Sequence, residues 1–408
     1  MIKLKDKILE YFLKYVKIDT MSKEEESTTP STLKQFDLAK VLVNDLKDLG
    51  LIDIKLDEHA IVTALLPSNC NSKLHIGFLA HMDTIPGFSG TNVKPNIIYN
   101  YDGSDINLKG ISLTNSEFPF LKDFIGKTLI TTDGTTVLGA DDKAGIANIM
   151  GMLAYFKENK DVKHVNIHVS FTPDEEIGMG IHSFNLDDFK CDYAYTVDGG
   201  NPTHIEYECF NAASAKVECF GFDIHPGSAK GHMINASLVA MEFNSMLNPN
   251  ERPEYTSGYE GFNHLCSITG EVGYARMDYI IRDHDLAKLN LKIKEFEEIT
   301  NFINLKYQKE VVKLEIKNQY LNMYEKIKKD DRCLKRAISS MKKLGINAVS
   351  DAIRGGTDGA FLTEIGLNTP NLGTGGYNCH GPYEFACLEE MELVSKILIE
   401  IAKEDENE

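Results

Sequence analysis

The sequence predicts an α/β fold, in which a central mixed, largely parallel sheet is flanked by helices and interrupted by a smaller α+β domain. Two observations lead to this prediction. Apolar runs of strand length alternate with helical stretches in the first half of the chain, as is typical of buried strands joined by helices. Near residue 207 this alternation gives way to strand–strand–helix patterns. We therefore expect a first domain in two parts, 1–209 and 321–408, with a second domain, 210–320, inserted between them.

Helices are predicted near the N-terminus and after Pro30. Five apolar residues repeat at helical spacing: Ile8, Leu9, Phe12, Tyr15 and Val16. A second helix is expected to begin near Ser31 and to end at Gly50, a typical residue just beyond a helix C-terminus. Strands are predicted at four apolar runs: 61–66, 74–80, 165–171 and 193–197. A helix is expected at 144–156, and 85–127 is expected to be a long loop with a hairpin.

The inserted domain is predicted from a repeated order of elements. Segment 207–222 suggests a pair of strands, and a second strand pair is expected at 264–282. Helices are predicted at 234–247 and 284–302, and a further strand at 312–317. Helix–strand alternation then resumes and ends in a closing helix at 388–403.

Composition excludes several classes of protein. The chain has 408 residues and a net charge of −18, which argues against nucleic acid as a partner. Its eight cysteines are scattered without a CxxC pair, which indicates a reducing, cytoplasmic compartment and neither a disulfide scaffold nor a thiolate zinc site. The N-terminal segment MIKLKDKILEYFLKYVKIDT predicts an amphipathic helix and no signal peptide. Since no run of 18 apolar residues occurs, we expect no membrane partner.

Several acidic and histidine side chains occur at the ends of predicted strands or in loops. Such side chains gather at one edge of an open α/β sheet, where sites form. His81 follows one apolar run, and a lone histidine there is more often structural. Asp83 stands two residues on, however, where it can hydrogen-bond the second ring nitrogen as metal-binding histidines require. His81 is therefore a candidate ligand.

Two acidic pairs extend this candidate site. Asp141 and Asp142 open a predicted helix, where one can cap the helix while the other faces the site. A carboxylate can bridge two cations about 3.5–4 Å apart. Glu175 and Glu176 form either a solvated turn or a site in which one glutamate binds a cation and the other is a general base.

Asp198 and His380 complete the candidate ligand set. Asp198 precedes Gly-Gly after a strand, and His380 lies in a glycine-rich loop. Each alone is more often structural. Nitrogen and carboxylate oxygen donors together suit two zinc ions, with manganese or cobalt as substitutes.

Several strings resemble a known family. They are TTDGTTVLGADDKAGIA, FTPDEEIG, YTVDGG, HPGSAKG, YIIRD, RGGTDGA and TGGYNCHG. They are similar to the peptidase T branch of the co-catalytic zinc peptidases, a family that also contains carboxypeptidase G, aminoacylase and acetylornithine deacetylase. The resemblance runs from about residue 5 to residue 400. It implies a catalytic domain interrupted by a lid or dimerisation domain, a homodimer, and removal of the N-terminal residue from tripeptides by a zinc-bridging water and a glutamate general base.

The resemblance also implies the role of each candidate residue. Ligands of one zinc correspond to His81 and Asp198, ligands of the second to Glu176 and His380, and the bridging carboxylate to Asp141. Glu175 corresponds to the general base, and Asp83 to the residue that orients His81. Residues that contact the substrate correspond to His225, Arg282 and Arg354. Arg282 has an alternative role, since it can pair with the neighbouring Asp283 or Asp285.

Three other functions remain open at this level. A zinc dipeptidase or N-acyl amino acid deacylase on the same scaffold would differ in its substrates. A metal-binding interaction protein would lack a ligand or the base, and here each expected position is filled. A structural zinc domain is typically closed and cysteine-rich, unlike this donor set.

Overall fold

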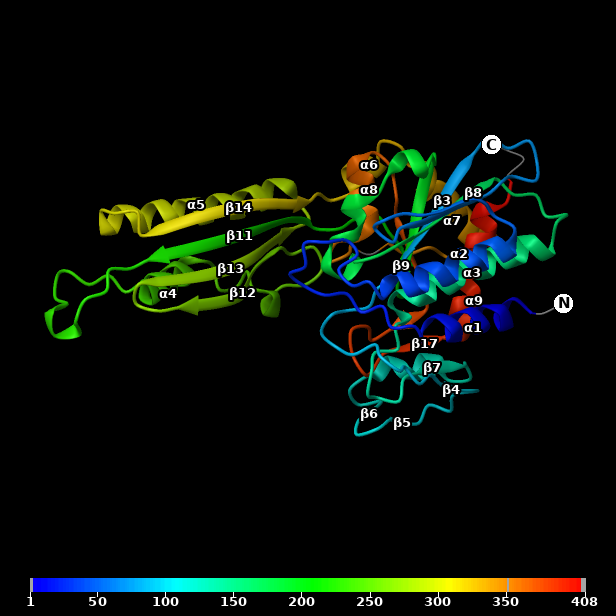
Figure 1. The fold of residues 1–408 in the computed structure, drawn as a ribbon, viewed down its shortest axis with the longest axis horizontal. Helices are drawn as coiled ribbons and strands as arrows, with labels where there is room; N and C mark the ends of the chain where they lie inside the picture. Colours follow the sequence, from blue (N-terminus) through cyan, green and yellow to red (C-terminus); the bar gives the residue numbers. More distant parts are fainter. Residues whose placement is uncertain (1–2, 351, 405–408) are drawn as a thin grey trace. The chain divides into compact units, whose positions relative to one another are not determined.

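The structure is a computed structural model that describes residues 3–350 and 352–404 (Figure 1). It divides the chain into two compact units. The first unit contains 3–207, 326–350 and 357–404, and the second contains 208–325 and 352–356. The segment 352–356, which the sequence analysis placed with the first domain, thus groups with the second unit.

A seven-stranded sheet forms the centre of the first unit. Its strands, in spatial order, are β1 (Ile52–Leu56), β2 (Val62–Leu66), β8 (Asn166–Thr172), β3 (His75–His81), β9 (Tyr193–Gly199), β15 (Asn371–Gly373) and β10 (Ile205–Glu206). The inner strands β8, β3, β9 and β15 are parallel to one another, and the outer pairs are antiparallel. The predicted mixed, largely parallel sheet is confirmed.

Helices surround this sheet. In chain order they are α1 (Leu4–Tyr15), α2 (Gln35–Leu49), α3 (Ala140–Glu158), α7 (Arg332–Lys343), α8 (Asp358–Ile365) and α9 (Leu388–Ala402). The short helix α6 (Tyr324–Ile327) begins in the second unit and ends in the first. Helix α3 is buried along most of its length because it packs on β3 and β9, and α1 and α9 pack on it in turn. Among the described helices, none combines the length and the apolar character needed to cross a bilayer.

A second, smaller sheet lies in the first unit. Its strands are β16 (Gly376–Tyr377), β17 (Phe385–Cys387), β7 (Leu129–Thr131) and β4 (Asn96–Ile98), all antiparallel. The expected loop 85–127 contains β4 and the predicted hairpin, formed by β5 (Ile106–Asn107) and β6 (Ser112–Leu113).

The second unit is an antiparallel sheet with two long helices. The strand order is β12 (Phe262–Gly270), β13 (Tyr274–Asp283), β11 (Asn211–Phe220) and β14 (Val312–Tyr320), and the helices are α4 (Ala236–Met246) and α5 (Leu286–Tyr307). The predicted strand pair at 207–222 is wrong, because β11 is one uninterrupted strand. It pairs with β13 on one side and β14 on the other.

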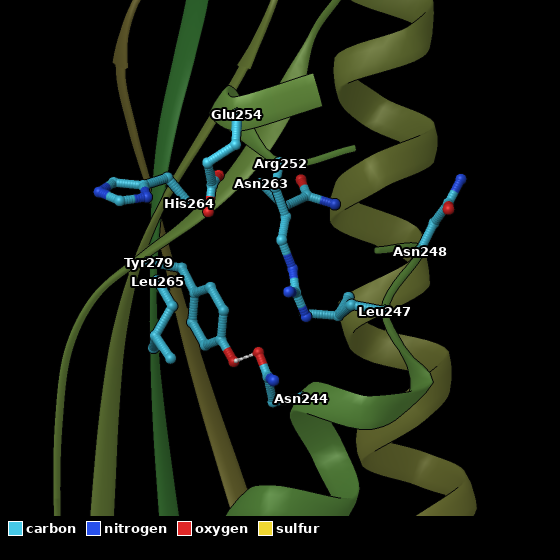
Figure 2. A pocket seen from close by; sticks show the side chains of 9 residues that line it. All are labelled: Asn244, Leu247, Asn248, Arg252, Glu254, Asn263, His264, Leu265 and Tyr279. Carbon is cyan, nitrogen blue, oxygen red and sulfur yellow. Dashed lines mark hydrogen bonds between the residues drawn. The ribbon is translucent and has the colours of Figure 1, made fainter. Parts of the chain in front are cut away.

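The second unit also contains a cavity of about 260 Å³. Figure 2 shows its lining residues: Asn244, Leu247, Asn248, Arg252, Glu254, Asn263, His264, Leu265 and Tyr279. The Tyr279 hydroxyl donates a hydrogen bond to Asn244 Oδ1 at 3.1 Å. None of these lining residues is a candidate site residue of the sequence analysis.

Candidate metal centre

The candidate ligands lie where three neighbouring parallel strands end. His81 is the last residue of β3, and Asp198 lies near the end of β9. Glu175 and Glu176 lie in a single turn of 3₁₀ helix, Glu175–Ile177, just after β8. Because β8, β3 and β9 are adjacent and parallel, their carboxyl ends bring these side chains to one edge of the sheet.

Asp141 lies between the two histidines. Its Oδ1 is 2.8 Å from His81 Nε2, and its Oδ2 is 3.1 Å from His380 Nε2. Residue 141 comes from the start of α3, whereas His380 comes from the loop between β16 and β17. One carboxylate therefore contacts ring nitrogens from two distant parts of the chain, one with each oxygen.

The five predicted ligands form two groups that share Asp141. His81, Asp141 and Asp198 form the first group, and Asp141, Glu176 and His380 form the second. In each group, one donor atom per residue lies within 4.8 Å of the others. The direct distances are 3.4 Å from His81 Nε2 to Asp198 Oδ1 and 3.1 Å from His380 Nε2 to Glu176 Oε2. This geometry has room for two cations that share one carboxylate.

The charges of these groups favour bound cations. Burial raises the pKa of Asp198 to about 7. Burial, together with repulsion from Asp198, raises the pKa of Glu175 well above its ordinary value. Hydrogen bonds with Asp141 and Glu176 raise the pKa of His380 to about 10. Clustered buried carboxylates are costly without positive charge nearby, which bound metal ions would supply.

Asp83 joins His81 to the turn that carries the glutamates. Its carboxylate accepts hydrogen bonds from the backbone N–H of Glu175 at 3.0 Å and of Glu176 at 3.3 Å. The same carboxylate has Oδ1 3.4 Å from His81 Nδ1, and the Asp83 side chain is fully buried. Asp83 therefore contacts two parts of the site, whereas the sequence analysis considered only His81.

Sequence reasoning missed Glu384, which supports the segment that carries Asp141. The Glu384 carboxylate accepts hydrogen bonds from the backbone N–H groups of Leu138 at 2.6 Å, Gly139 at 2.8 Å and Asp141 at 3.0 Å. Burial raises its pKa to about 7. The signal in the sequence is weak: an acidic residue four positions after His380, directly before the apolar strand β17.

Two more buried aspartates were not considered as supports of the site. Asp142 Oδ2 accepts a hydrogen bond from the backbone N–H of His81 at 3.2 Å, and Oδ1 accepts one from Gly145 at 3.1 Å. Of the acidic pair, then, Asp142 accepts a hydrogen bond from a backbone N–H inside α3, while Asp141 faces the histidines. Asp358 accepts a hydrogen bond from the Thr172 hydroxyl at 2.8 Å, and burial raises its pKa to about 6. Asp358 lies within the string RGGTDGA, from which the sequence analysis selected only the arginine.

The three predicted substrate-binding residues belong to the second unit. His225 is exposed, and its Nδ1 accepts a hydrogen bond from the backbone N–H of Gly227 at 3.1 Å. The Arg282 guanidinium donates to the backbone oxygens of Ala213 and Ile281, each at 3.0 Å, and lies over the Tyr320 ring.

Arg354 is held within the second unit by a loop and by two aromatic rings, Phe210 and Phe262. Its guanidinium donates to the backbone oxygens of Gly258 and Glu260, each at 2.8 Å, and to Thr256 Oγ1 at 2.9 Å. It also lies 5.2 Å from the centre of the Phe210 ring. These contacts order a loop of the second unit, and a role in substrate binding stays a prediction for all three residues.

The fold and the paired metal-ligand groups are those of a dinuclear metallohydrolase. Residues 137–404 match the family model of peptidase family M20/M25/M40, and the chain therefore belongs to this family of peptide hydrolases. It is 51% identical over 401 residues to a peptidase T from Caldanaerobacter subterraneus subsp. tengcongensis, covering 97% of this chain and 98% of the relative. It is 48% identical over 400 residues to a peptidase T from Alkaliphilus oremlandii, with coverages of 97% and 98%. The family resemblance found in the sequence is confirmed.

Solved structures share the fold over nearly the whole chain. An aminopeptidase PepT from Bacillus cereus superposes with a TM-score of 0.76 at 21% identity, and a tripeptidase from Staphylococcus aureus with 0.78 at 22%. Each comparison covers 98% of both chains. A dinuclear metal-binding peptidase of the M20 family from Bacillus subtilis has a TM-score of 0.66 at 13% identity, covering 98% of this chain and 97% of the other.

Proposed function

We propose that this chain is a two-zinc aminopeptidase that removes the N-terminal residue from tripeptides. The observation that carries the proposal is the sharing of Asp141 by two ligand groups, each completed by a histidine and a second carboxylate. Relatives named peptidase T at about half identity, and the shared fold of a tripeptidase, support the choice of substrate.

The proposed metal ligands follow from these two groups. His81 and Asp198 would hold one zinc ion, Glu176 and His380 would hold the other, and Asp141 would belong to both ligand sets. Imidazole nitrogen and carboxylate oxygen are ligands that zinc accepts, and manganese or cobalt can substitute for it. When bound at these residues, zinc would lower the pKa of a water molecule and polarise the scissile carbonyl.

Glu175 is the proposed general base, because it directly precedes the proposed ligand Glu176, interacts electrostatically with His81, Asp141 and Asp198, and belongs to neither ligand group. It accepts a proton from the attacking water and passes it to the leaving amine. Asp83 supports this role by holding the backbone N–H of Glu175, which limits where the carboxylate can go. The same carboxylate lies beside His81 Nδ1, so Asp83 orients the ligand and the base together.

Substrate recognition is assigned to the second unit. We propose that His225 binds the substrate or stabilises the oxyanion, and that Arg282 or Arg354 binds the C-terminal carboxylate of the tripeptide. A guanidinium grips a carboxylate through two parallel hydrogen bonds, which is how a fixed substrate length can be selected.

Self-association and a cytoplasmic location complete the proposal. The second unit exposes large apolar side chains on its helices: Leu238, Met241, Leu291, Phe302 and Leu305. Such a surface supports a homodimer, which light scattering on the purified protein tests. All eight cysteines are free thiols, which suits a reducing cytoplasm, and cell fractionation tests that location.

The deciding experiment combines metal analysis with a substrate panel. The zinc-loaded chain should hydrolyse tripeptides faster than dipeptides or tetrapeptides and should leave N-acetyl amino acids intact. Glu175→Ala should lose about 10²–10⁴-fold in kcat while retaining both metal ions. Loss of one metal ion in Glu175→Ala would show that this glutamate is a ligand. Cleavage of N-acetyl amino acids in preference to tripeptides would identify the chain as a deacylase.

A further inference from the structure

A buried hydrogen-bonded cluster lies directly before the proposed general base. We call Ser31, Gln35 and Asp174 the Asp174 cluster. Asp174 Oδ2 accepts a hydrogen bond from the backbone N–H of Ser31, and Oδ1 accepts from Ser31 Oγ and Gln35 Nε2, each at 2.6 Å. Asp174 and Gln35 have no exposed surface, and Ser31 is 8% exposed. Hydrogen bonds to a buried, charged acceptor are the strong ones.

The cluster joins the start of α2 to the segment that follows β8. Gln35 is the first residue of α2, and it contacts Asp174 through both ends of its amide. Its Nε2 donates to the Asp174 carboxylate, while its Oε1 accepts from the backbone N–H of Asp174 at 3.2 Å. Ser31 Oγ in turn accepts from the backbone N–H of Lys23 at 2.9 Å. Both the side chain and the backbone of Asp174 are therefore held by residues from an earlier part of the chain.

The backbone conformation of Asp174 sets the direction in which the chain enters the turn at Glu175. Asp174 has a φ of 54°, in the left-handed region, and its carbonyl oxygen accepts hydrogen bonds from Met179 at 3.0 Å and Gly180 at 3.3 Å. As whole residues, Glu175–Ile177 are each partly exposed. Hydrogen bonds to Asp83, and those made by the backbone and side chain of Asp174, hold this turn in place.

We propose that Asp174 is a positioning residue for the general base, and that Ser31 and Gln35 act through it to aim the Glu175 carboxylate. The inference rests on the proposed role of Glu175. Asp83 holds the turn through the backbone N–H groups of Glu175 and Glu176. Ser31 and Gln35 hold the same turn through Asp174, the residue just before it. A displacement of about 1 Å in a reacting group costs on the order of 100-fold in rate, so both anchors matter.

Two variants of the cluster test the proposal in the zinc-loaded, full-length chain. Asp174→Asn keeps the size and tolerates positive φ, but it loses the charge and one acceptor. Gln35→Met keeps the length and the helix preference but loses the side-chain hydrogen bonds of Gln35, including both to Asp174. Each should lower kcat on a tripeptide about 10–100-fold, with KM changed by less than about threefold and two zinc ions retained. Unchanged kcat with only a lower melting temperature would show a purely structural role and overturn the proposal.

A pair of serine variants covers the case in which Asp174→Asn fails to fold. Ser31→Ala removes the hydroxyl and should lower kcat, whereas Ser31→Thr retains it and should keep kcat within about threefold of the wild type. Ser395→Ala is the matched control, because Ser395 is also a buried serine, and its hydroxyl donates to the backbone oxygen of Asn148 at 3.1 Å. A fall in kcat as large in Ser395→Ala as in Ser31→Ala would contradict the inference.

Hydrogen exchange tests the cluster independently of activity. In the metal-free protein, peptides covering 174–180 should exchange about tenfold faster in Gln35→Met than in the wild type. Peptides covering 194–197, within β9, should exchange at the same rate in both. If the wild type cleaves no peptide, the proposed function fails while the exchange result still stands. Unchanged exchange across 174–180 in Gln35→Met, Ser31→Ala and Asp174→Asn would refute the positioning role itself.

Discussion

The carboxylate of Asp83 accepts a hydrogen bond from the backbone N–H of Glu175 at 3.0 Å. This contact joins the end of β3 to the turn after β8, and the same carboxylate lies beside His81. Loss of its charge should therefore disturb a metal ligand and the proposed base together.

Asp83→Asn tests this double contact. The amide has one acceptor oxygen, and its NH₂ group would face a backbone donor. We expect metal affinity to fall about 10–100-fold and kcat to fall by at least a similar factor when metal is saturating. Competition with a zinc chelator and steady-state kinetics measure the two effects. Asp102→Asn, at an exposed turn, is the control. A change in metal affinity without a change in kcat would show that Asp83 acts on His81 and has no effect on Glu175.

The sharing of Asp141 predicts unequal metal losses. Asp141→Ala removes a donor from both groups and should leave less than one metal ion per chain after dialysis. Asp198→Ala and Glu176→Ala each remove a donor from one group and should retain about one ion. Metal content by mass spectrometry distinguishes these cases. Retention of one ion by Asp141→Ala would show that it belongs to a single site.

Glu384→Gln should destabilise the metal-free protein. Three backbone N–H groups point at the carboxylate, and an amide can satisfy only part of that set. We expect a loss of about 1–3 kcal/mol in the free energy of unfolding and weaker metal binding, since the Asp141 segment loosens. Urea unfolding with Glu117→Gln as an exposed control measures the first effect. Equal stability of Glu384→Gln and the wild type would mean that the Glu384 carboxylate adds nothing to folding.

The pair His75 and His168 predicts acid sensitivity away from the metal centre. Their ring nitrogens lie 2.8 Å apart, and burial and then repulsion from His75 lower the pKa of His168 to about 4. Because the folded pKa lies below the unfolded value of about 6.5, the folded state disfavours the proton. The stabilisation is present above about pH 6.5 and is lost as the pH falls towards 4.

His168→Gln should reduce this loss. Between pH 7.5 and pH 5, the metal-free wild type should lose about 1–2 kcal/mol more in the free energy of unfolding than the variant does. Urea unfolding at both pH values measures the difference, with the exposed His264→Gln as a control. Parallel pH dependence of His168→Gln and the wild type would exclude His168 as the titrating group.

Predictions based on apolar periodicity were the most reliable in the first unit. Four apolar runs correspond to β2, β3, β8 and β9, and the helical spacing near the N-terminus corresponds to α1. The short strands β10 and β15 gave no such signal, because a strand of two or three residues is too short for periodicity. The predicted strand pair at 207–222 failed because local composition does not show that a strand has partners on both sides.

The sequence by itself determined the types of most elements, the family, and the five candidate ligands, because these depend on local patterns and on motifs. Only the tertiary structure decided that Asp141 faces both histidines, that Glu384 holds its segment, and that Ser31 and Gln35 reach Asp174. These contacts join residues far apart in the chain. Local sequence carries little information about which distant donor a buried carboxylate meets, since chain packing brings the two together.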